Sequence, residues 1–476
     1  MKQSKIIGRE KEMEELQRCV QSSEAELVVV YGRRRVGKTF LVREFFNNSF
    51  AFQLTGLYNQ PKSVQLHNFA ITLSEYSHNP IQIPSSWLEA FTMLRSYLES
   101  LSGEEKKVVF IDEMPWLDTR LSDFLSAFEW FWNGWGASRN DLMVIACGSA
   151  TSWIADKILA NKGGLFNRTT SRIYLRPFTL YETEQYLLSR GIHWSRYDIA
   201  ECYMIMGGIP YYLRLLSPQV SYTSNIDELF FKKKGKLWDE FEHLYQTLFS
   251  NADAYIQIVE ALSSKRMGLT RNEIIAATKL PNNGVLTRML NNLADSDFIR
   301  PYNFYGRKKR DTIYQLSDYY SIFYFRFLKG MHGKDEQFWT HTLDNPQRRA
   351  WAGCTFEQVC KDHIRCIKRA IGIGGVLSED SSWHQLQGEQ RTQIDLLIDR
   401  RDRVINLCEI KYSLAPFVID KDYDMVLRNK VETFRQATRT NKALHLTMIA
   451  TYGLKENAYS SMIQSVVVLD DLFVLQ

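Results

Sequence analysis

The stretch Gly32-Arg33-Arg34-Arg35-Val36-Gly37-Lys38-Thr39 decides the first part of the fold. It follows the apolar run 27–31, precedes a helical pattern over 39–46, and fits the spacing G-x-x-x-x-G-K-[ST] of a phosphate-binding loop. The glycines let backbone N–H groups point at phosphate oxygens, and the N-terminal end of the following helix favours the same anion. The stretch therefore predicts a nucleotide-binding α/β domain. In it, Lys38 reaches the β- and γ-phosphates and the Thr39 hydroxyl binds Mg²⁺.

A second motif supplies carboxylates for this site. The apolar run 108–111 ends in Asp112 and Glu113, and two buried acids are costly unless a cation lies opposite them. We expect Asp112 to hold the Mg²⁺ through water and Glu113 to polarise the attacking water as general base. The pair favours nucleotide hydrolysis over storage; a solvated strand end is the alternative.

Length and pattern predict several domains. A chain of 476 residues suits roughly two to four domains. Alternating strand-like and helical runs predict a P-loop core with a parallel sheet over 1–176. The later patterns predict a helical lid and linker over 177–250, a winged-helix domain over 251–330 and a separate α/β domain over 331–476.

Composition limits the class of protein. Hydrophobic residues make up 45% and charged residues 24%, which excludes a wholly disordered, collagen-like or coiled-coil chain. The net charge of +5 permits an anionic partner without demanding one. Apolar runs fall short of the roughly 18 residues of a membrane span and no signal core is present, so we expect a cytoplasmic protein without a membrane partner.

The cysteines do not predict a structural role. Seven scattered cysteines fit a reducing compartment better than a disulfide framework. Cys360, His363 and Cys366 look like zinc ligands at first, but on one helix the two cysteines lie about 120° apart around the axis. Such a spacing disfavours a tetrahedral zinc site.

The N-terminal motifs resemble a known group. Gly8-Arg9-Glu10, Cys147-Gly148-Ser149 and 208–213 (Gly-Ile-Pro-Tyr-Tyr-Leu) accompany the loop and the acidic pair. Over residues 6 to about 212 the chain resembles the AAA+-related STAND ATPases, in particular prokaryotic ATPases often described as archaeal-type. The resemblance implies ATP and Mg²⁺ as cofactors. The residues expected to bind nucleotide are Gly32, Arg33, Arg34, Arg35, Val36, Gly37, Lys38, Thr39 and Ser149.

The same resemblance implies three further roles, each with a plain alternative. Ser149 occupies a sensor position that feels the γ-phosphate, or is a small residue needed for packing. Arg168 neutralises transition-state charge, in cis or from a neighbouring subunit; Arg172 competes for this role, and both also suit an ordinary surface. The Gly-Gly-Ile-Pro turn at 207–210 shapes the lid, or simply ends a helix. The loop arginines contact phosphate or point to solvent.

The predicted winged helix allows two interpretations. Residues 283–294 have the pattern of a recognition helix, and 305–311 form a basic hairpin tip suited to the phosphate backbone of DNA. The alternative is an interdomain or dimerisation spacer, because a basic tip without base-reading residues carries little specificity.

The C-terminal domain carries a second acidic pattern. Asp395, Glu409 and Lys411 follow D-x13-E-x-K on two apolar strands. We expect Asp395 and Glu409 to bind Mg²⁺ or Mn²⁺, and Lys411 to orient the water or stabilise the pentavalent phosphate. Glu357, on a preceding helix, would complete the metal shell. The alternatives are ordinary ion pairing between strands and, for Glu357, a solvated helix residue.

This part of the chain also resembles a known group. Trp383-His384, 393–395 (Gln-Ile-Asp), 409–411 (Glu-Ile-Lys) and the helix with Lys430 and Phe434 resemble the PD-(D/E)XK nuclease superfamily over residues 352 to 472. Related chains often carry Glu where Gln393 stands, so no acidic role is expected there. The resemblance implies a restriction-endonuclease-like domain acting on DNA.

These expectations combine into one hypothesis and two rivals. The chain is expected to be an Mg²⁺-dependent ATPase switch that controls a DNA-binding or DNA-cleaving domain and forms a nucleotide-dependent homo-oligomer. One rival is an ATP-gated scaffold whose C-terminal domain binds nucleic acid or protein without cleavage. The other is a signalling ATPase that assembles rings.

Overall fold

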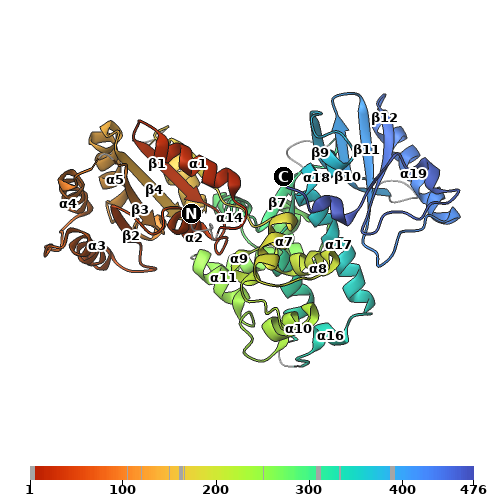
Figure 1. The fold of residues 1–476 in the computed structure, drawn as a ribbon. Coiled ribbons are helices and arrows are strands. Elements are labelled where there is room, and N and C mark those ends of the chain that lie inside the picture. The colour runs from red at the N-terminus through yellow and green to blue at the C-terminus, as the bar shows by residue number, and fades with distance from the viewer. Residues whose placement is uncertain are drawn as a thin grey trace. The chain divides into compact units, whose positions relative to one another are not determined.

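The computed structural model describes residues 6–103, 105–119, 121–149, 151–159, 164–165, 167–249, 251–306, 312–331, 334–385 and 392–475. The chain divides into two compact units, Met1–Pro177 and Phe178–Gln476. Figure 1 shows the first unit in red to yellow and the second in yellow-green to blue. Among the described residues, no helix has the length and apolar character needed to cross a membrane.

The first unit is an α/β fold built on a five-stranded sheet in the order β2-β3-β4-β1-β5. All of its strand pairs are parallel. The strands are β1 (Glu26–Tyr31), β2 (Phe52–Thr55), β3 (Lys107–Asp112), β4 (Leu142–Gly148) and β5 (Ser171–Tyr174). Every residue of β4 is buried, as expected for a parallel sheet covered on both faces. Because parallel strands run the same way, their carboxyl ends share one edge, where ligands bind in such sheets.

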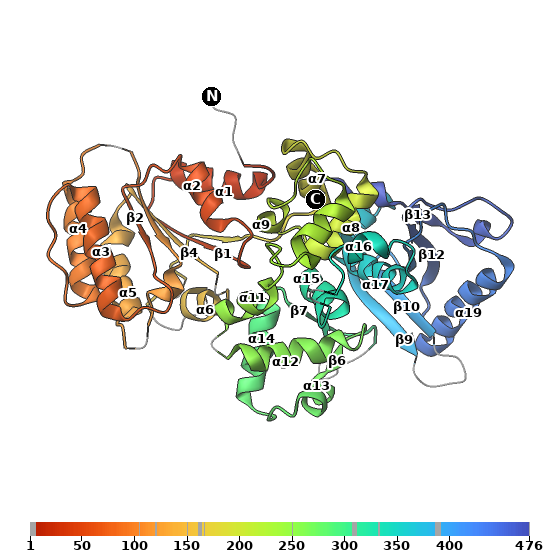
Figure 2. The same ribbon diagram turned by 90° about the horizontal axis from the view of Figure 1, so that it is seen from below.

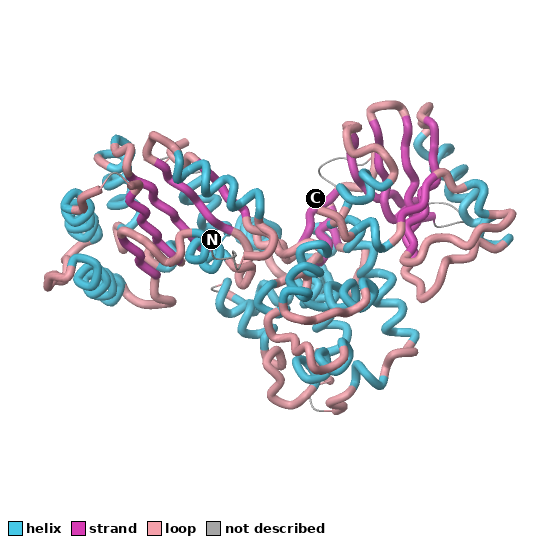
Figure 3. Tube along the Cα trace, viewed as in Figure 1, coloured by secondary structure: helices cyan, strands magenta, loops and turns pink. Residues whose placement is uncertain are grey.

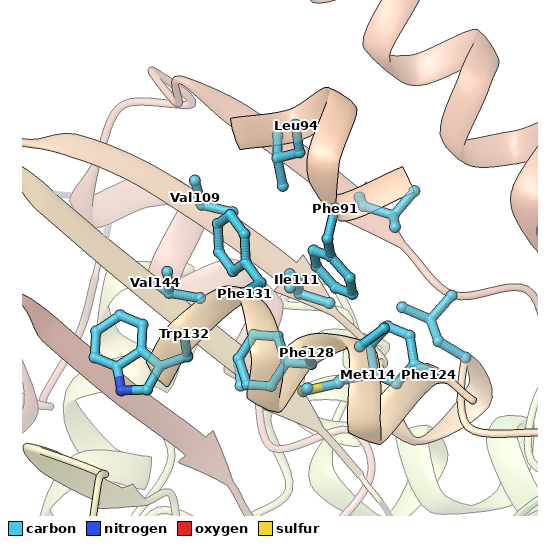
Figure 4. Packing of buried hydrophobic residues seen from close by; sticks show 14 of the residues in the cluster. Phe91, Leu94, Val109, Ile111, Met114, Phe124, Phe128, Phe131, Trp132 and Val144 are labelled. Carbon is cyan, nitrogen blue, oxygen red and sulfur yellow. The ribbon is translucent and has the colours of Figure 1, made fainter. Parts of the chain in front are cut away.

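Helices flank this sheet, as the cyan and magenta tubes of Figure 3 show. They are α1 (Glu10–Gln21), α2 (Lys38–Phe45), α3 (Lys62–Ser77), α4 (Trp87–Ser100), α5 (Phe124–Gly134) and α6 (Thr151–Ile154), with shorter turns η1 (Met114–Trp116), η2 (Gly136–Ser138) and η3 (Ala155–Leu159). Aromatic side chains fill the space between α4, α5 and the sheet: Phe91 stacks on Phe131 at 5.2 Å between ring centroids (Figure 4). The same core contains Val109, Ile111 and Val144, so it fixes the two strands whose ends carry Asp112 and Ser149.

The second unit begins with a helical region. Its helices are α7 (Leu180–Ser189), α8 (Arg196–Met206), α9 (Pro210–Leu213), α10 (Tyr222–Ile226), η4 (Asp227–Phe231) and α11 (Glu240–Leu248). The Gly-Gly-Ile-Pro turn ends α8: Gly207 and Gly208 have φ values of 64° and 65°. A Cβ on Gly208 would lie 2.2 Å from the Phe178 carbonyl oxygen, so this position requires glycine. Pro210 then starts α9, where its missing N–H costs nothing.

The next region, here named the hairpin segment (residues 252–316), has three main helices and a small sheet, seen best in Figure 2. Its elements are α12 (Ala252–Ser263), β6 (Leu269–Thr270), α13 (Arg271–Thr278), α14 (Gly284–Asp295), β7 (Ile299–Tyr302) and β8 (Ile313–Leu316). The sheet order is β6-β8-β7, with antiparallel pairs. Most of the basic tip expected between β7 and β8, residues 307–311, lies outside the described residues.

The C-terminal segment (residues 346–475) is a mixed α/β fold. After α15 (Tyr319–Phe323), η6 (Tyr324–Leu328) and α16 (Phe338–His341), it contains α17 (Pro346–Asp362), α18 (Ile364–Ala370), β9 (Ser378–Gln385), β10 (Thr392–Arg400), β11 (Val404–Lys411), α19 (Lys421–Thr438), β12 (Ala443–Ala450), η7 (Ser460–Met462), β13 (Ser465–Val467) and η8 (Leu469–Leu472). The sheet order is β13-β12-β11-β10-β9. Strand β10 runs antiparallel to both neighbours, whereas β11, β12 and β13 are parallel. Phe434 of α19 packs into the core beneath β10 and β11 with Leu397 and Leu407.

Candidate functional site

The loop between β1 and α2 curls because of its glycines. Gly32 has φ 140° and Gly37 has φ 93°, conformations that side chains disfavour. A Cβ on Gly32 would lie 2.3 Å from the Leu175 carbonyl oxygen, so the loop also passes very close to the end of β5. Arg35 has a left-handed φ of 73° as well. The backbone is thus held in the curved shape that aims N–H groups at an anion.

Lys38 at the start of α2 is folded back onto this loop. Its Nζ donates hydrogen bonds to the carbonyl oxygens of Gly32 at 3.0 Å and Arg33 at 2.8 Å. Only 6% of the side chain is exposed, and this burial lowers the pKa of Lys38, although nearby acidic groups act in the opposite direction. A buried ammonium group with two neutral acceptors is well placed to bind an anion such as a phosphate.

Thr39 and Asp112 meet at the same edge of the sheet. The Thr39 hydroxyl donates to both carboxylate oxygens of Asp112, at 3.1 and 2.9 Å, and Asp112 is 3% exposed. Hydroxyl and carboxylate oxygens at this separation are the hard ligands that Mg²⁺ prefers, with water and phosphate completing its shell. These two residues therefore fit the Mg²⁺ that accompanies a nucleotide.

Glu113 and Ser149 form a second contact beside the first. Glu113 has a left-handed φ of 47°, and its Oε2 accepts from the Ser149 hydroxyl at 2.9 Å and from the Ser149 N–H at 3.2 Å. Gly148 lets the end of β4 lie close to the turn that follows Glu113, since a Cβ on Gly148 would lie 2.6 Å from Pro115 Cδ. The structure thus brings Ser149 to the expected general base, a pairing that the motif spacing did not reveal.

The other arginines are distributed differently. Arg33 is buried, while Arg34 and Arg35 are half-buried. Arg34 lies close enough to Lys38 for its charge to lower the pKa of that lysine. Arg9 is buried in the N-terminal segment, and its Nη2 donates to the Arg176 carbonyl oxygen at 2.7 Å just after β5. From the sequence, Arg9 was identified only as part of the motif Gly8-Arg9-Glu10, without a role of its own.

Arg168 lies at the opposite edge of the sheet, whereas Arg172 lies nearer the middle of the strands. Arg168 precedes β5, and Arg172 within β5 pairs with Val29 of the parallel strand β1. Both are exposed. Because the phosphate loop follows the other end of β1, the structure does not bring Arg168 to the loop of its own chain. An in-cis role for Arg168 disagrees with this position.

The C-terminal acids gather around a bulge in β10. The register between β9 and β10 shifts between Ile394 and Leu397, and Asp395 sits in this irregular stretch, where its carbonyl oxygen accepts from the Ser382 hydroxyl at 2.8 Å. Bulges commonly re-aim a side chain next to a functional site. Gln393 Nε2 donates to Asp395 Oδ1 at 3.1 Å, so this glutamine holds the acid in place.

Glu409 on β11 has both carboxylate oxygens occupied. Its Oε1 accepts from the Tyr423 hydroxyl at 2.6 Å and lies 3.0 Å from Lys411 Nζ, while its Oε2 accepts from Lys430 Nζ at 2.7 Å. The helix α19 therefore supplies two of the three partners. Tyr423 was not expected at this site, and Lys430 was known only as part of the helix motif.

The two acids have opposite pKa shifts. Burial and the nearby Glu409 charge raise the pKa of Asp395 above its usual value. Burial would also raise the pKa of Glu409, but Lys430 and Lys411 outweigh it, so the pKa of Glu409 is lowered. A cation bound between them would meet one acid whose charged form is disfavoured by burial and one whose oxygens are engaged by two lysines.

Glu357 on α17 pairs with a residue from another segment. Arg266, in the turn between α12 and β6, donates from Nη2 to Glu357 Oε1 and lies 3.6 Å from Asp395 Oδ1. Within the described part of the chain, no group of three or more metal-ligating side chains is placed to hold an ion. The expected shell of Glu357, Asp395 and Glu409 is thus not formed, because basic side chains occupy the positions facing these carboxylates.

Comparisons with known proteins agree with the first site. Residues 6–216 match the family model described as "ATPase domain predominantly from Archaea". The uncharacterized protein MJECL04 of Methanocaldococcus jannaschii is 24% identical over 413 residues, covering 86% of this chain and 87% of that protein. The uncharacterized ATP-binding protein MJ0423 of the same organism is 45% identical over 43 residues, 9% of this chain and 73% of that protein.

Solved structures with a similar arrangement are more distant. The Walker-type ATPase PABY2304 of Pyrococcus abyssi has a TM-score of 0.48 and 19% identity, covering 68% of this chain and 96% of that one. Cdc6p from Pyrobaculum aerophilum has a TM-score of 0.35 and 12% identity, covering 76% of this chain and 96% of that one. On the family match, residues 6–216 are an ATPase domain of the archaeal type.

Proposed function

We propose that this chain is an Mg²⁺-dependent ATPase switch whose nucleotide state controls a C-terminal segment that acts on DNA. The observation that carries the ATPase half is the meeting of Lys38, Thr39, Asp112 and Glu113 at one edge of the sheet. Hydrolysis needs a phosphate cradle, a metal anchor and a base, and this edge provides residues for all three. The match of residues 6–216 to an ATPase family supports the same reading.

Each residue has a distinct task in this proposal. Bound MgATP supplies the phosphoryl group and much of the charge neutralisation. Lys38 exchanges the Gly32 and Arg33 carbonyl oxygens for phosphate oxygens, and Thr39 with Asp112 anchors the metal. Glu113 orients the attacking water and takes its proton. Ser149 restrains the Glu113 carboxylate until the γ-phosphate offers a competing acceptor.

Two variants test the ATPase half. Lys38→Ala should lose ATP binding and turnover, because the buried cation facing the phosphates is gone. Glu113→Gln should keep binding but lose at least about 100-fold in kcat, the scale of one general base. Lys62→Ala, which removes a half-exposed ion pair with Asp123, is the control. Retained hydrolysis by Lys38→Ala would refute its role.

For the C-terminal segment we propose a metal-dependent nuclease that resembles the PD-(D/E)XK group. Its support is the gathering of Asp395, Glu409 and Lys411 on adjacent strands, with Glu357 facing them. The rival is a scaffold that binds nucleic acid or protein without cleavage. The rival is favoured by the ion pairs that now occupy these carboxylates.

Incubation of the pure protein with plasmid and Mn²⁺ separates these two functions. The nuclease reading expects nicking or linearisation by the wild type and none by Asp395→Ala or Glu409→Ala. Equal cleavage by wild type and variants would discard it. Plasmid binding without cleavage would favour the scaffold.

We further propose that the hairpin segment is a winged helix that serves mainly as an interdomain spacer. Its three helices and hairpin suit that fold, and α14 exposes Arg288 and Asn291 for contact with DNA. Yet the Tyr305 N–H donates to the Ser382 carbonyl oxygen at 2.9 Å, and the Tyr305 ring packs on Phe434 at 5.5 Å. Tyr305, which follows β7, is therefore packed on the C-terminal segment.

An oligomer working in the cytoplasm completes the proposal. Arg168 is exposed at the edge opposite the phosphate loop, so it is placed to serve a neighbouring subunit better than its own. An arginine supplied in trans can neutralise transition-state charge. Such a role requires an oligomer, and we propose that its assembly depends on nucleotide.

A further inference from the structure

The C-terminal acidic site has no excess of acidic over basic side chains, and the nearby Lys361 also interacts electrostatically with Asp395. Glu409 is paired with Lys411 and Lys430, and Glu357 and Asp395 face the single guanidinium of Arg266. Asp395 and Glu409 are 8% and 6% exposed. A divalent cation that joined these acids while all of the basic groups stayed would add two positive charges to a site without excess negative charge, which is unfavourable where solvation is poor.

We propose that the side chain of Arg266 competes with a divalent cation for Glu357 and Asp395. The guanidinium must leave these two carboxylates before the metal binds. This inference rests on the metal-dependent function proposed above for the C-terminal segment. It adds that the hairpin segment, through one side chain, controls whether the acidic site accepts metal.

Arg266 is the basic residue suited to leaving. Its side chain is 43% exposed, against 30% for Lys411 and 20% for Lys430. Both lysines belong to the C-terminal segment and bind Glu409 from β11 and α19. Arg266 instead faces two acids from a turn that belongs to a different segment, so its departure disturbs neither the sheet nor α19.

The backbone of this turn is held by the hairpin segment. Gln315 Nε2 donates to the Arg266 carbonyl oxygen at 2.8 Å, and the Tyr302 hydroxyl donates to the Met267 carbonyl oxygen at 2.6 Å. Gly268 has φ 81°, and a Cβ there would lie 2.3 Å from the Tyr314 carbonyl oxygen. The guanidinium therefore follows the position of the hairpin segment.

Further contacts join the same two segments. Arg300 pairs with Asp362 at the end of α17, and Phe304 packs edge-on against His384 at 3.8 Å between ring centroids. With Tyr305 on Ser382, they hold the hairpin segment where Arg266 reaches the acids. A shift of that segment would withdraw Arg266 and expose Glu357 and Asp395 together, so metal binding and segment position are linked.

Mn²⁺ titration of the full-length protein without nucleotide tests this proposal, with free Mn²⁺ followed by electron paramagnetic resonance. Asp395→Asn defines the binding that belongs to other sites. Arg266→Met should bind Mn²⁺ about tenfold more tightly than wild type at the Asp395-dependent site, because one cation at contact distance is removed. Adding Asp395→Asn to Arg266→Met should abolish the gain.

Lys265→Met is the matched control, because this neighbouring cation pairs with Glu273 of its own segment at 2.6 Å. It should bind Mn²⁺ as wild type does. Arg266→Gln, which keeps a hydrogen-bond donor for Glu357 without the charge, provides a second variant if the methionine variant folds poorly.

Two results overturn the inference, and they differ. Equal Asp395-dependent affinity in wild type and both Arg266 variants would show that Arg266 does not compete, while the proposed metal site would stand. No Asp395-dependent Mn²⁺ binding in wild type or in any Arg266 variant would remove the metal-dependent function itself, and the competition with it.

Discussion

At the residue scale, the pairing of Ser149 with Glu113 separates two interpretations of a small polar residue. A serine needed only for packing does not require its hydroxyl, whereas here the hydroxyl lies 2.9 Å from the carboxylate that would activate water. The main-chain N–H of the same residue also contacts that carboxylate, at 3.2 Å. A substitution of the side chain therefore removes only part of the restraint.

Ser149→Ala should lower kcat about tenfold while the Kd for ATP changes little, because the hydroxyl orients the base and does not hold the nucleotide. Steady-state hydrolysis and calorimetric binding measure the two effects. Ser138→Ala, which removes a hydroxyl bonded to the Trp135 carbonyl oxygen, controls for the loss of a hydroxyl elsewhere in the unit. An unchanged kcat in Ser149→Ala would restore the packing interpretation.

The residues that sequence could identify are those whose partners are close in the motif. Lys38 and Thr39 follow the glycines directly, and Asp112 and Glu113 end an apolar strand, so local pattern located all four. Arg266 gave no such signal, because its partners Glu357 and Asp395 are brought to it only by tertiary packing. For Arg168 the sequence left open a role in cis or from a neighbouring subunit, because the pattern does not show at which edge of the sheet this arginine lies.

At the element scale, His363 connects two helices through both ring nitrogens. Its Nε2 accepts from the Leu180 N–H at the start of α7 at 2.9 Å, and Nδ1 lies 2.8 Å from the Val359 carbonyl oxygen in α17. Accepting at Nε2 requires the neutral ring with its proton on Nδ1. These bonds also engage the histidine that, with Cys360 and Cys366, first resembled a zinc site.

This histidine predicts a pH dependence of stability. Burial lowers the pKa of His363 below its usual 6.5, so the unfolded chain binds a proton more readily than the folded one. Stability contributed by the neutral ring is therefore present above about pH 6.5 and is lost as the pH falls below it. Melting temperatures at pH 7.5 and 5.5 should differ more for wild type than for His363→Gln, which cannot be charged.

A control and a contradicting result follow from the same geometry. His243, exposed on α11 beside Asp239, gives a variant, His243→Gln, that should leave the wild-type pH dependence almost unchanged. The same pH dependence in wild type and His363→Gln would show that the buried ring does not carry the effect.

Several elements follow from sequence and others do not. Strands β1 and β3 were predicted by the apolar runs 27–31 and 108–111, whereas the short strand β2 (Phe52–Thr55) was not. The bulge at Asp395 was not, because it depends on pairing with β9, where Ser382 takes up the displaced carbonyl oxygen. The contact of Tyr305 with Ser382 could not be predicted either, because the sequence of a basic hairpin is the same whether the hairpin contacts DNA or protein.

At the scale of the whole molecule, the proposed switch joins a nucleotide site in one unit to an acidic site in the other. A nucleotide can shift such a molecule only if two arrangements bind it with different affinity. The distance from Arg266 to Glu357 and Asp395 would distinguish two such arrangements, because it depends on the position of the hairpin segment. All of this depends on nucleotide binding at the loop after β1.

Calorimetric titration of wild type with a non-hydrolysable ATP analogue and Mg²⁺ tests that dependence most directly. Saturable heat is expected for wild type, weaker binding for Asp112→Asn, and none for Lys38→Ala. No heat from wild type at saturating analogue and Mg²⁺ would contradict the nucleotide site and the switch built on it.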